Sequence, residues 1–450
     1  MAKSKQKFIC QNCEAVFYKW AGRCENCGEW NSLVEQTLPE MGRSAVARSI
    51  NNGKPLQVNS LNSIPFEEGM KRLKTGIGDL DIILGGGILP GGVTLLAGQP
   101  GIGKSTLLLQ TVSNIAHNYD VLYISGEESA GQVRLRAARL GADKSSNLNF
   151  AASTSADDIA ATIRTGKYQL VVVDSVQTLH LNEITSSPGS VSQITNSSNV
   201  IINAAKETGT SVIFVGHVTK EGSIAGPKIL EHLVDVVLQF EGDRYGGFKI
   251  VRAVKNRYGS TNEAAIFEMG EKGLKIVENP SAALLAERRD EDGSVVLATL
   301  EGARPLLVEI QALVNSTNFG YPKRTASGFD INRLNLLIAV LERRTKLKLS
   351  DKDIYINVVG GIKISDPAAD LAICMAIASA SAGRRLNYGT VVFGEVGLGG
   401  EVRSVTSIEK RIAEAKKLGF TKALAPRTGK DEFIIGVDNV RSTLIEYLQK

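Results

Sequence analysis

The residues best suited to chemistry lie in one short glycine-rich segment. Residues 98–106 read GQPGIGKST, so four residues separate Gly98 from the run Gly103, Lys104 and Ser105. A loop with so little side-chain bulk lets backbone N–H groups converge on phosphate oxygens at the N-terminus of a helix. In such a loop Lys104 reaches the β- and γ-phosphates of a nucleotide and Ser105 holds Mg²⁺. We therefore predict that this segment binds ATP with Mg²⁺.

The flanking sequence favours this prediction over a chance glycine-rich turn. An apolar run at 93–97 and a helical stretch at 107–110 supply the strand and the helix between which such a loop must lie. The predicted nucleotide contacts are Gly98, Gln99, Pro100, Gly101, Ile102, Gly103, Lys104, Ser105 and Thr106.

Two further apolar runs end in acids. The run at 170–173 precedes Asp174, and the run at 121–124 leads to Glu127 and Glu128. The carboxyl ends of parallel strands form the ligand-binding edge of an open α/β sheet, so we predict Asp174 on the Mg²⁺ side and Glu127 as the base that activates the attacking water. Alternatively, Glu127 and Glu128 are acids at the N-terminus of the next helix, where they favour its dipole. The two roles are compatible.

Four of the five cysteines fall within the first 27 residues, as the pairs Cys10 and Cys13, then Cys24 and Cys27. Two tight pairs at this spacing are typical of a closed tetrahedral Zn²⁺ site. Two disulfides are the alternative, which a reducing compartment disfavours. Four thiolates leave no open coordination position, so the metal would stabilise a small fold rather than catalyse.

The composition is that of a large cytoplasmic protein. The chain has 450 residues, 43% of them hydrophobic, and a formal net charge of +5, which suits two or three domains. No run of about 20 apolar residues could span a bilayer, and the first residues lack the apolar segment of a secretory signal. We expect a cytoplasmic location and no membrane partner. Any affinity for nucleic acid must come from local basic clusters.

The distribution of strand-like and helical runs predicts the domain organisation. Such runs alternate between about 73 and 278, which favours an α/β domain with a parallel, doubly wound sheet. The stretch before it is polar and contains Pro39 and Pro55, as a linker does. We predict a four-cysteine zinc finger at 1–35, a linker at 36–63, an ATPase domain at 64–279 and a further α+β domain at 280–450.

Three motifs in one order resemble a known family. Residues 75–81 read TGIGDLD before the glycines at 85–87 and 91–92, which is similar to the approach to the phosphate loop in RecA-type ATPases. Together with the four-cysteine finger and KNRYG at 255–259, nearly the whole chain resembles the bacterial RadA (Sms) family of DNA-repair proteins. The family's motif is KNRFG, and Tyr258 keeps the ring. The resemblance implies a RecA-like core, a homohexameric ring, ATP hydrolysis, and DNA translocation that drives branch migration in homologous recombination.

Cations near the end of a strand-like run are candidates for catalysis across a subunit boundary. Lys255 and Arg257 follow the run at 248–254, where they could reach a γ-phosphate of a neighbouring subunit and stabilise the transition state. Arg257 is also a candidate DNA contact. The alternative is a solvated basic turn.

A glycine-punctuated stretch at 217–228 follows another strand-like run. In RecA-type folds the corresponding loop faces the axial channel, so the resemblance implies that Lys220 and Lys228 hold DNA phosphates. His217 could sense the γ-phosphate or could be an ordinary hydrogen-bonded residue.

The segment after 280 resembles the proteolytic domain of Lon-type proteases, but without the chemistry. Where a Lon protease has its nucleophilic serine this chain has Ala368, which has no hydroxyl to attack a peptide. The activating lysine aligns with Glu409, with Lys410 next to it. We predict a proteolytically inactive domain.

Basic residues concentrate around one predicted helix at 332–344. Arg324, Arg343 and Arg344 could track DNA phosphates, or the arginines near the helix end could simply favour its dipole.

Two functions fit these residues. The first is an ATP-driven DNA motor that binds single-stranded and branched DNA, moves along a strand and unwinds one duplex while extending another, with a recombinase such as RecA as partner. The second is an ATP-gated DNA clamp or loader that assists a recombinase without unwinding. Displacement of a labelled strand by ATP turnover separates them.

Overall fold

The computed structural model describes residues 7–11, 15–17, 19–30, 32–36, 60, 71–217, 229–242, 247–317, 320–427 and 431–448. The chain divides into two compact units, Met1–Glu68 and Gly69–Lys450. The predicted linker at 36–63 lies almost wholly outside the described residues.

The first unit is a small antiparallel sheet. Its strands are β1 (Lys7–Cys10), β2 (Val16–Phe17) and β3 (Leu33–Gln36), in the order β2-β1-β3. Only Cys10, Cys24 and Leu33 form its buried apolar cluster within the described residues. A cluster of three side chains is too small to stabilise a fold, so this unit depends on a cross-link or a metal.

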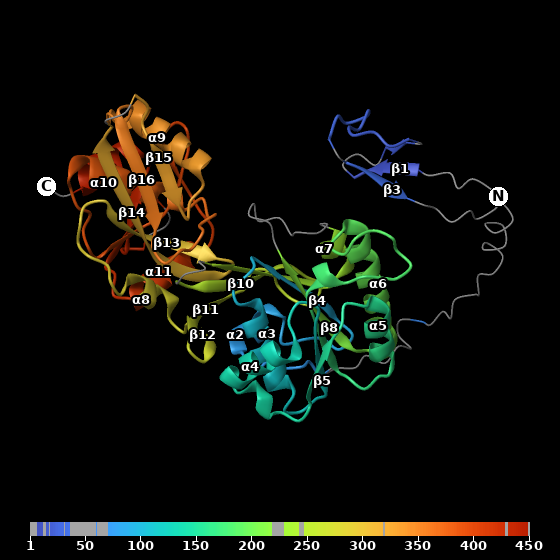
Figure 1. Cartoon of the computed structure of the whole chain (residues 1–450). Coiled ribbons are helices and arrows are strands. Elements are labelled where there is room, and N and C mark those ends of the chain that lie inside the picture. Colours follow the sequence, from blue (N-terminus) through green and yellow to red (C-terminus); the bar gives the residue numbers. More distant parts are fainter. Residues whose placement is uncertain are drawn as a thin grey trace. The chain divides into compact units, whose positions relative to one another are not determined.

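The second unit contains a nine-stranded sheet (Figure 1), in the order β12-β11-β10-β9-β4-β8-β7-β5-β6. Its parallel strands are β4 (Val93–Gly98), β5 (Val121–Ser125), β6 (Leu148–Ala152), β7 (Leu170–Asp174), β8 (Ser211–His217) and β9 (Val236–Gly242). An antiparallel extension follows, with β10 (Lys249–Asn256), β11 (Ala264–Gly270) and β12 (Gly273–Ile276). The parallel part is as predicted, whereas the extension was not predicted.

Helices cover both faces of this sheet. They are α2 (Gly78–Ile83), α3 (Lys104–Ile115), α4 (Ala130–Leu140), α5 (Ala156–Arg164), α6 (Val191–Thr208) and α7 (Ile229–Leu233). One apolar cluster contains side chains of α3 and the other contains side chains of α5 and α6. Strands buried on both faces read as continuous apolar runs, which is why 93–97, 121–124 and 170–173 could be predicted. The doubly wound α/β class is confirmed.

A second sheet of seven strands follows in the chain, in the order β15-β16-β14-β13-β17-β20-β21. The strands are β13 (Ser294–Glu301), β14 (Arg304–Ser316), β15 (Arg324–Ser327), β16 (Lys352–Val358), β17 (Thr390–Val392), β20 (Lys422–Pro426) and β21 (Ile434–Val437). A hairpin of β18 (Glu395–Val396) and β19 (Val402–Arg403) lies outside that sheet. Parallel and antiparallel pairs are mixed in the sheet, as expected of an α+β domain.

The helices of this part are α8 (Pro280–Leu285), α9 (Ile331–Thr345), α10 (Ala369–Ala382), α11 (Ile408–Lys417) and α12 (Val440–Tyr447). Helix α10 is apolar on nearly every side because it is buried within the core. Ile250, Ala264 and Ile266 of the antiparallel extension belong to this same core. The extension therefore joins the two sheets through one continuous apolar cluster.

In the described parts of the chain, no helix has the length and apolar character that crossing a membrane requires.

Candidate nucleotide and metal sites

The glycine-rich loop connects β4 to α3, as predicted. Gly101 and Gly103 have φ of 77° and 116°, a backbone region that favours glycine. A Cβ on Gly103 would also lie 2.9 Å from Cε of Met269. Gly103 is the N-cap of α3 and no side chain caps this helix end. Its first amides are thus available to an anion, as phosphate binding requires.

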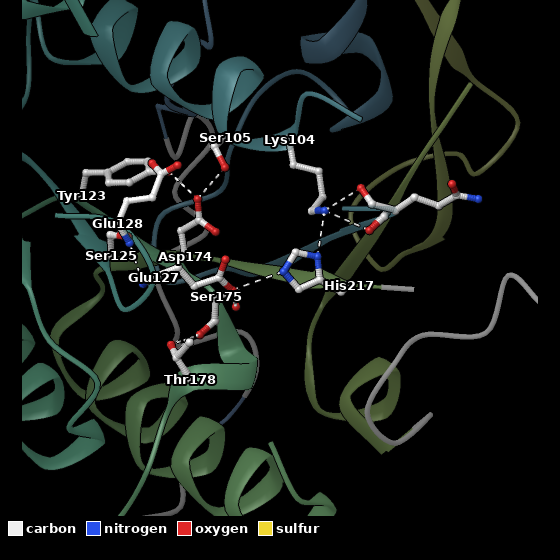
Figure 2. Close-up of polar contacts among 12 residues, drawn as sticks. Lys104, Ser105, Tyr123, Ser125, Glu127, Glu128, Asp174, Ser175, Thr178 and His217 are labelled. Atoms are coloured by element: carbon white, nitrogen blue, oxygen red, sulfur yellow. Dashed lines mark hydrogen bonds and ion pairs between the residues drawn. The ribbon is translucent and has the colours of Figure 1, made fainter. Parts of the chain in front are cut away.

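Lys104 extends along the loop (Figure 2) with a buried side chain. Its Nζ donates to the backbone oxygens of Gly98 and Gln99 at 2.9 and 3.0 Å. It also lies 3.2 Å from Nδ1 of His217. Burial lowers the pKa of Lys104 to about 8, although Asp174 and Glu127 oppose that shift. The cation is therefore poorly compensated without a bound anion.

Asp174 lies at the carboxyl end of β7 and accepts hydrogen bonds from side chains of α3 and β5. Its Oδ2 accepts hydrogen bonds from Oγ of Ser105 at 2.7 Å and from the hydroxyl of Tyr123 at 2.6 Å. Burial raises the pKa of Tyr123 well above its usual range, and the charge of Asp174 adds to that rise. Tyr123 thus remains a protonated donor at neutral pH.

Glu127 and Glu128 have different surroundings, which separates the two roles considered for them. Oε1 of Glu127 accepts from Oγ of Ser175 at 2.5 Å and lies 3.3 Å from Nε2 of His217. Burial raises the pKa of Glu127, but these hydrogen bonds and the His217 and Lys104 charges outweigh it and lower the pKa. Glu128 instead makes a two-pronged pair with Arg136, at 2.8 and 2.5 Å. Glu127 contacts Ser175 and His217 rather than an arginine, and its role as the base stays a prediction.

These side chains share one cavity of about 350 Å³. It is lined by Pro100, Gly101, Gly103, Lys104, Ser105, Thr106, Ser125, Glu127, Glu128, Arg136, Arg139, Asp174 and His217. The uncapped helix end and the cations fit a polyphosphate, while Ser105 and Asp174 are oxygen donors that fit Mg²⁺. When bound, Mg²⁺ would neutralise charge that develops on the phosphate oxygens.

Sequence reasoning missed Arg136 and Arg139. They lie three residues apart on α4, so both face the cavity from the same side of that helix. That spacing, on a helix that begins directly after the two acids, was a signal that could have found them.

Lys255 and Arg257 do not lie among the residues that line this cavity in their own chain. Nζ of Lys255 donates to the backbone oxygens of Glu231 and Val234 at 2.6 and 2.8 Å, near the end of α7. Nη1 of Arg257 pairs with Oδ1 of Asp235 at 3.2 Å, and the Arg257 side chain is 53% exposed. Their catalytic role stays a prediction.

The predicted DNA contacts are dispersed. Lys220 and Lys228 lie outside the described residues. Arg324 is on β15, whereas Arg343 and Arg344 are exposed in the last turn of α9. Nε of Arg344 donates to the backbone oxygen of Leu398 at 3.3 Å. Cations in the last turn of a helix interact favourably with its dipole, so the two α9 arginines stabilise α9 whatever else they bind.

Ala368 is fully buried at the N-cap of α10. Glu409 is exposed, while Arg411 of α11 is buried and bonds to Asp366 at 2.7 Å. Asp366 in turn accepts from the backbone N–H of Ala368. The ion pair of Arg411 and Asp366 therefore lies beside Ala368.

Three of the four predicted zinc ligands converge in the first unit. The sulfurs of Cys10, Cys24 and Cys27 all lie within 4.8 Å of one another, and those of Cys10 and Cys27 are 3.5 Å apart. This separation excludes a disulfide at about 2.05 Å. It suits sulfurs that share a tetrahedral Zn²⁺ with bonds of about 2.3 Å. Cys13 lies outside the described residues.

Three family models match the chain. The AAA domain matches residues 69–223, the rubredoxin metal binding domain matches 8–35, and subunit ChlI of Mg-chelatase matches 334–429. With the sheet order and the phosphate loop, they define a RecA-like P-loop ATPase with an N-terminal zinc ribbon and a C-terminal domain of the ChlI and Lon type.

Curated relatives narrow this class. The chain is 48% identical to the DNA repair protein RadA of Bacillus subtilis over 99% of both chains. It is 46% identical to RadA of Pseudomonas aeruginosa over 95% of this chain and 94% of that one. This chain belongs to the RadA family of DNA repair proteins, and its cofactors are ATP, Mg²⁺ and Zn²⁺. Among solved structures, the RadB recombinase aligns with 46% of this chain and all of that chain, at 22% identity and a TM-score of 0.37.

Proposed function

We propose that this chain is an ATP-driven DNA motor of DNA repair and homologous recombination. It forms a homohexameric ring, binds single-stranded and branched DNA, and couples ATP hydrolysis to translocation that drives branch migration. A recombinase of the RecA type is its partner. The relatives are named DNA repair protein RadA, which supports a role in DNA repair.

The observation that carries the proposal is the position of His217. It ends β8, and its two ring nitrogens lie against Lys104 and Glu127. Residues 218–228 follow it directly and include Lys220 and Lys228. A change of charge at the γ-phosphate alters both contacts of His217. Because His217 directly precedes the segment proposed to hold DNA, the change at the nucleotide acts on the start of that segment.

The position of Lys255 and Arg257 supports a ring. Because neither lines the cavity of its own chain, any action on the nucleotide must come from a neighbouring subunit. Arg257→Ala subunits mixed with Lys104→Ala subunits should then recover part of the ATP turnover that each variant lacks alone, because a mixed ring contains sites with an intact Lys104 beside an intact Arg257 of the neighbour. No recovery on mixing would count against action across subunits.

Strand displacement tests the motor. The unaltered protein should release a labelled strand from a forked or three-stranded DNA with ATP, and Lys104→Ala should not. If ATP only strengthens binding and no strand is released, the chain is instead an ATP-gated clamp or loader.

The basic residues of the second sheet and α9 can be tested separately. If Arg324, Arg343 or Arg344 contacts DNA phosphates, replacing it with alanine should reduce the slope of log affinity against log salt by about 1. An unchanged slope would leave that residue a structural one.

A further inference from the structure

Tyr123 is a buried polar residue that the proposed hydrolysis does not use. It lies on β5 directly beside β7, where Tyr123 pairs with Val172 two residues before Asp174. Its side chain is 1% exposed and packs within the apolar cluster below α3. Its hydroxyl nevertheless bonds to the carboxylate that faces the nucleotide cavity (Figure 2).

Packing alone does not account for the hydroxyl. A phenylalanine would fill the same volume without placing a polar group in an apolar cluster, where an unsatisfied hydroxyl is unfavourable. Here the hydroxyl is satisfied by a single acceptor, Oδ2 of Asp174. The oxygen that accepts from Tyr123 is the one that accepts from Ser105.

Two donors on one oxygen fix the rotation of the carboxylate. Tyr123 approaches from the core and Ser105 from the phosphate loop, and in the described chain both side-chain hydrogen bonds of Asp174 end on Oδ2. Oδ1 is thereby left for a further ligand at the cavity.

We propose that Tyr123 is a positioning residue for Mg²⁺, which orients Asp174 from the core so that its carboxylate meets the ion in one fixed geometry. The inference rests on the assignment of Asp174 to the Mg²⁺ side of the proposed ATPase. Hydrogen-bonding partners of metal-binding carboxylates commonly change metal affinity by 10- to 100-fold when they are removed.

The test measures the binding of a fluorescent ADP analogue to the full chain during Mg²⁺ titration, without any turnover. Tyr123→Phe removes one hydroxyl and keeps the ring. We expect the Mg²⁺ midpoint to rise by about 10-fold or more. Nucleotide affinity in EDTA should stay within about twofold, because the phosphate loop is untouched.

Tyr258→Phe is the matched control, since its phenol lies beside another aspartate, Asp235, away from the cavity. It should leave the Mg²⁺ midpoint unchanged. The proposal is overturned if Tyr123→Phe keeps the wild-type midpoint. It is equally overturned if Tyr123→Phe weakens binding to the same extent with and without Mg²⁺, because that pattern reports only a disturbed core.

Asp174→Asn distinguishes the failure of this inference from failure of the site assignment. It should raise the Mg²⁺ midpoint more than Tyr123→Phe does. If Asp174→Asn has a wild-type midpoint, Asp174 is not on the Mg²⁺ side. If only Tyr123→Phe keeps the wild-type Mg²⁺ midpoint, the assignment of Asp174 stands and the positioning role of Tyr123 is wrong.

Discussion

Nη1 of the buried Arg411 lies 2.7 Å from Oδ2 of the partly exposed Asp366, and this pair adjoins Ala368, at the place that resembles the nucleophile position of a Lon-type protease. The same guanidinium donates to the backbone oxygens of Ala298 and Thr406. Burial raises the pKa of Asp366, but the hydrogen bond and charge of Arg411 outweigh this and lower it. The place of a catalytic centre is thus occupied by a satisfied structural pair.

Removing the cation should destabilise the protein. Arg411→Met leaves Asp366 without its partner, which should lower the free energy of unfolding by about 3–5 kcal/mol. Chemical denaturation measures this, with Arg403→Met as control because Arg403 and Glu401 form an exposed pair that should contribute little to stability. Because the pKa of Asp366 is lowered by folding, the pair stabilises fully above about pH 4 and less as pH falls further. Equal losses in the two variants would contradict this.

The two neighbouring acids should differ in turnover. Glu127→Gln keeps the shape but cannot take a proton, so ATP hydrolysis should fall by about 10²- to 10⁴-fold while ATP binding persists. Glu128→Gln should weaken the pair with Arg136 and affect turnover far less. Steady-state hydrolysis and equilibrium nucleotide binding check both. A larger loss of turnover in Glu128→Gln would reverse the assignment.

Nucleotide affinity should depend on pH through Lys104. With its pKa lowered to about 8 in the nucleotide-free chain, about one molecule in ten carries the cation at pH 9. Phosphates favour the charged form, so binding takes up a proton and ATP affinity should fall about tenfold from pH 7 to pH 9. Isothermal titration measures the affinity and the proton uptake. Lys104→Met should bind weakly with little pH dependence, and a pH-independent wild type would refute the argument.

The zinc content of the protein should depend on the clustered cysteines of the first unit and not on Cys374. Cys27→Ser removes a sulfur from the site, so the purified protein should lose its one equivalent of zinc. Metal analysis measures this. Cys374→Ala is the control, because Cys374 is buried in α10 where burial raises the pKa of the thiol, and it should retain zinc. Full zinc occupancy in Cys27→Ser would contradict the site.

The parts predicted from sequence are those whose signal is local. A glycine pattern specifies the phosphate loop, and the apolar run before Asp174 specifies β7. The start of α6 follows from Ser190, whose side chain caps it, and its end from Gly209, which takes the left-handed C-cap conformation.

What escaped prediction depends on neighbours distant in the chain. Tyr123 reads as one more apolar strand residue, because only the pairing of β5 with β7 brings it to Asp174. Arg411 reads as a solvated helix residue, because its partner lies 45 residues away. Neither contact produces a periodic pattern in the sequence from which it could be predicted.

The apolar cluster that unites Ile250, Ala264 and Ile266 with β13 and β14 has a consequence for dissecting the protein. A stop codon near residue 280 would remove β13 and β14, whose apolar side chains pack against the outer strands of the ATPase sheet. The truncated chain would expose this apolar face to solvent and aggregate. The C-terminal domain thus supplies the other side of an apolar core that the outer strands of the ATPase sheet share.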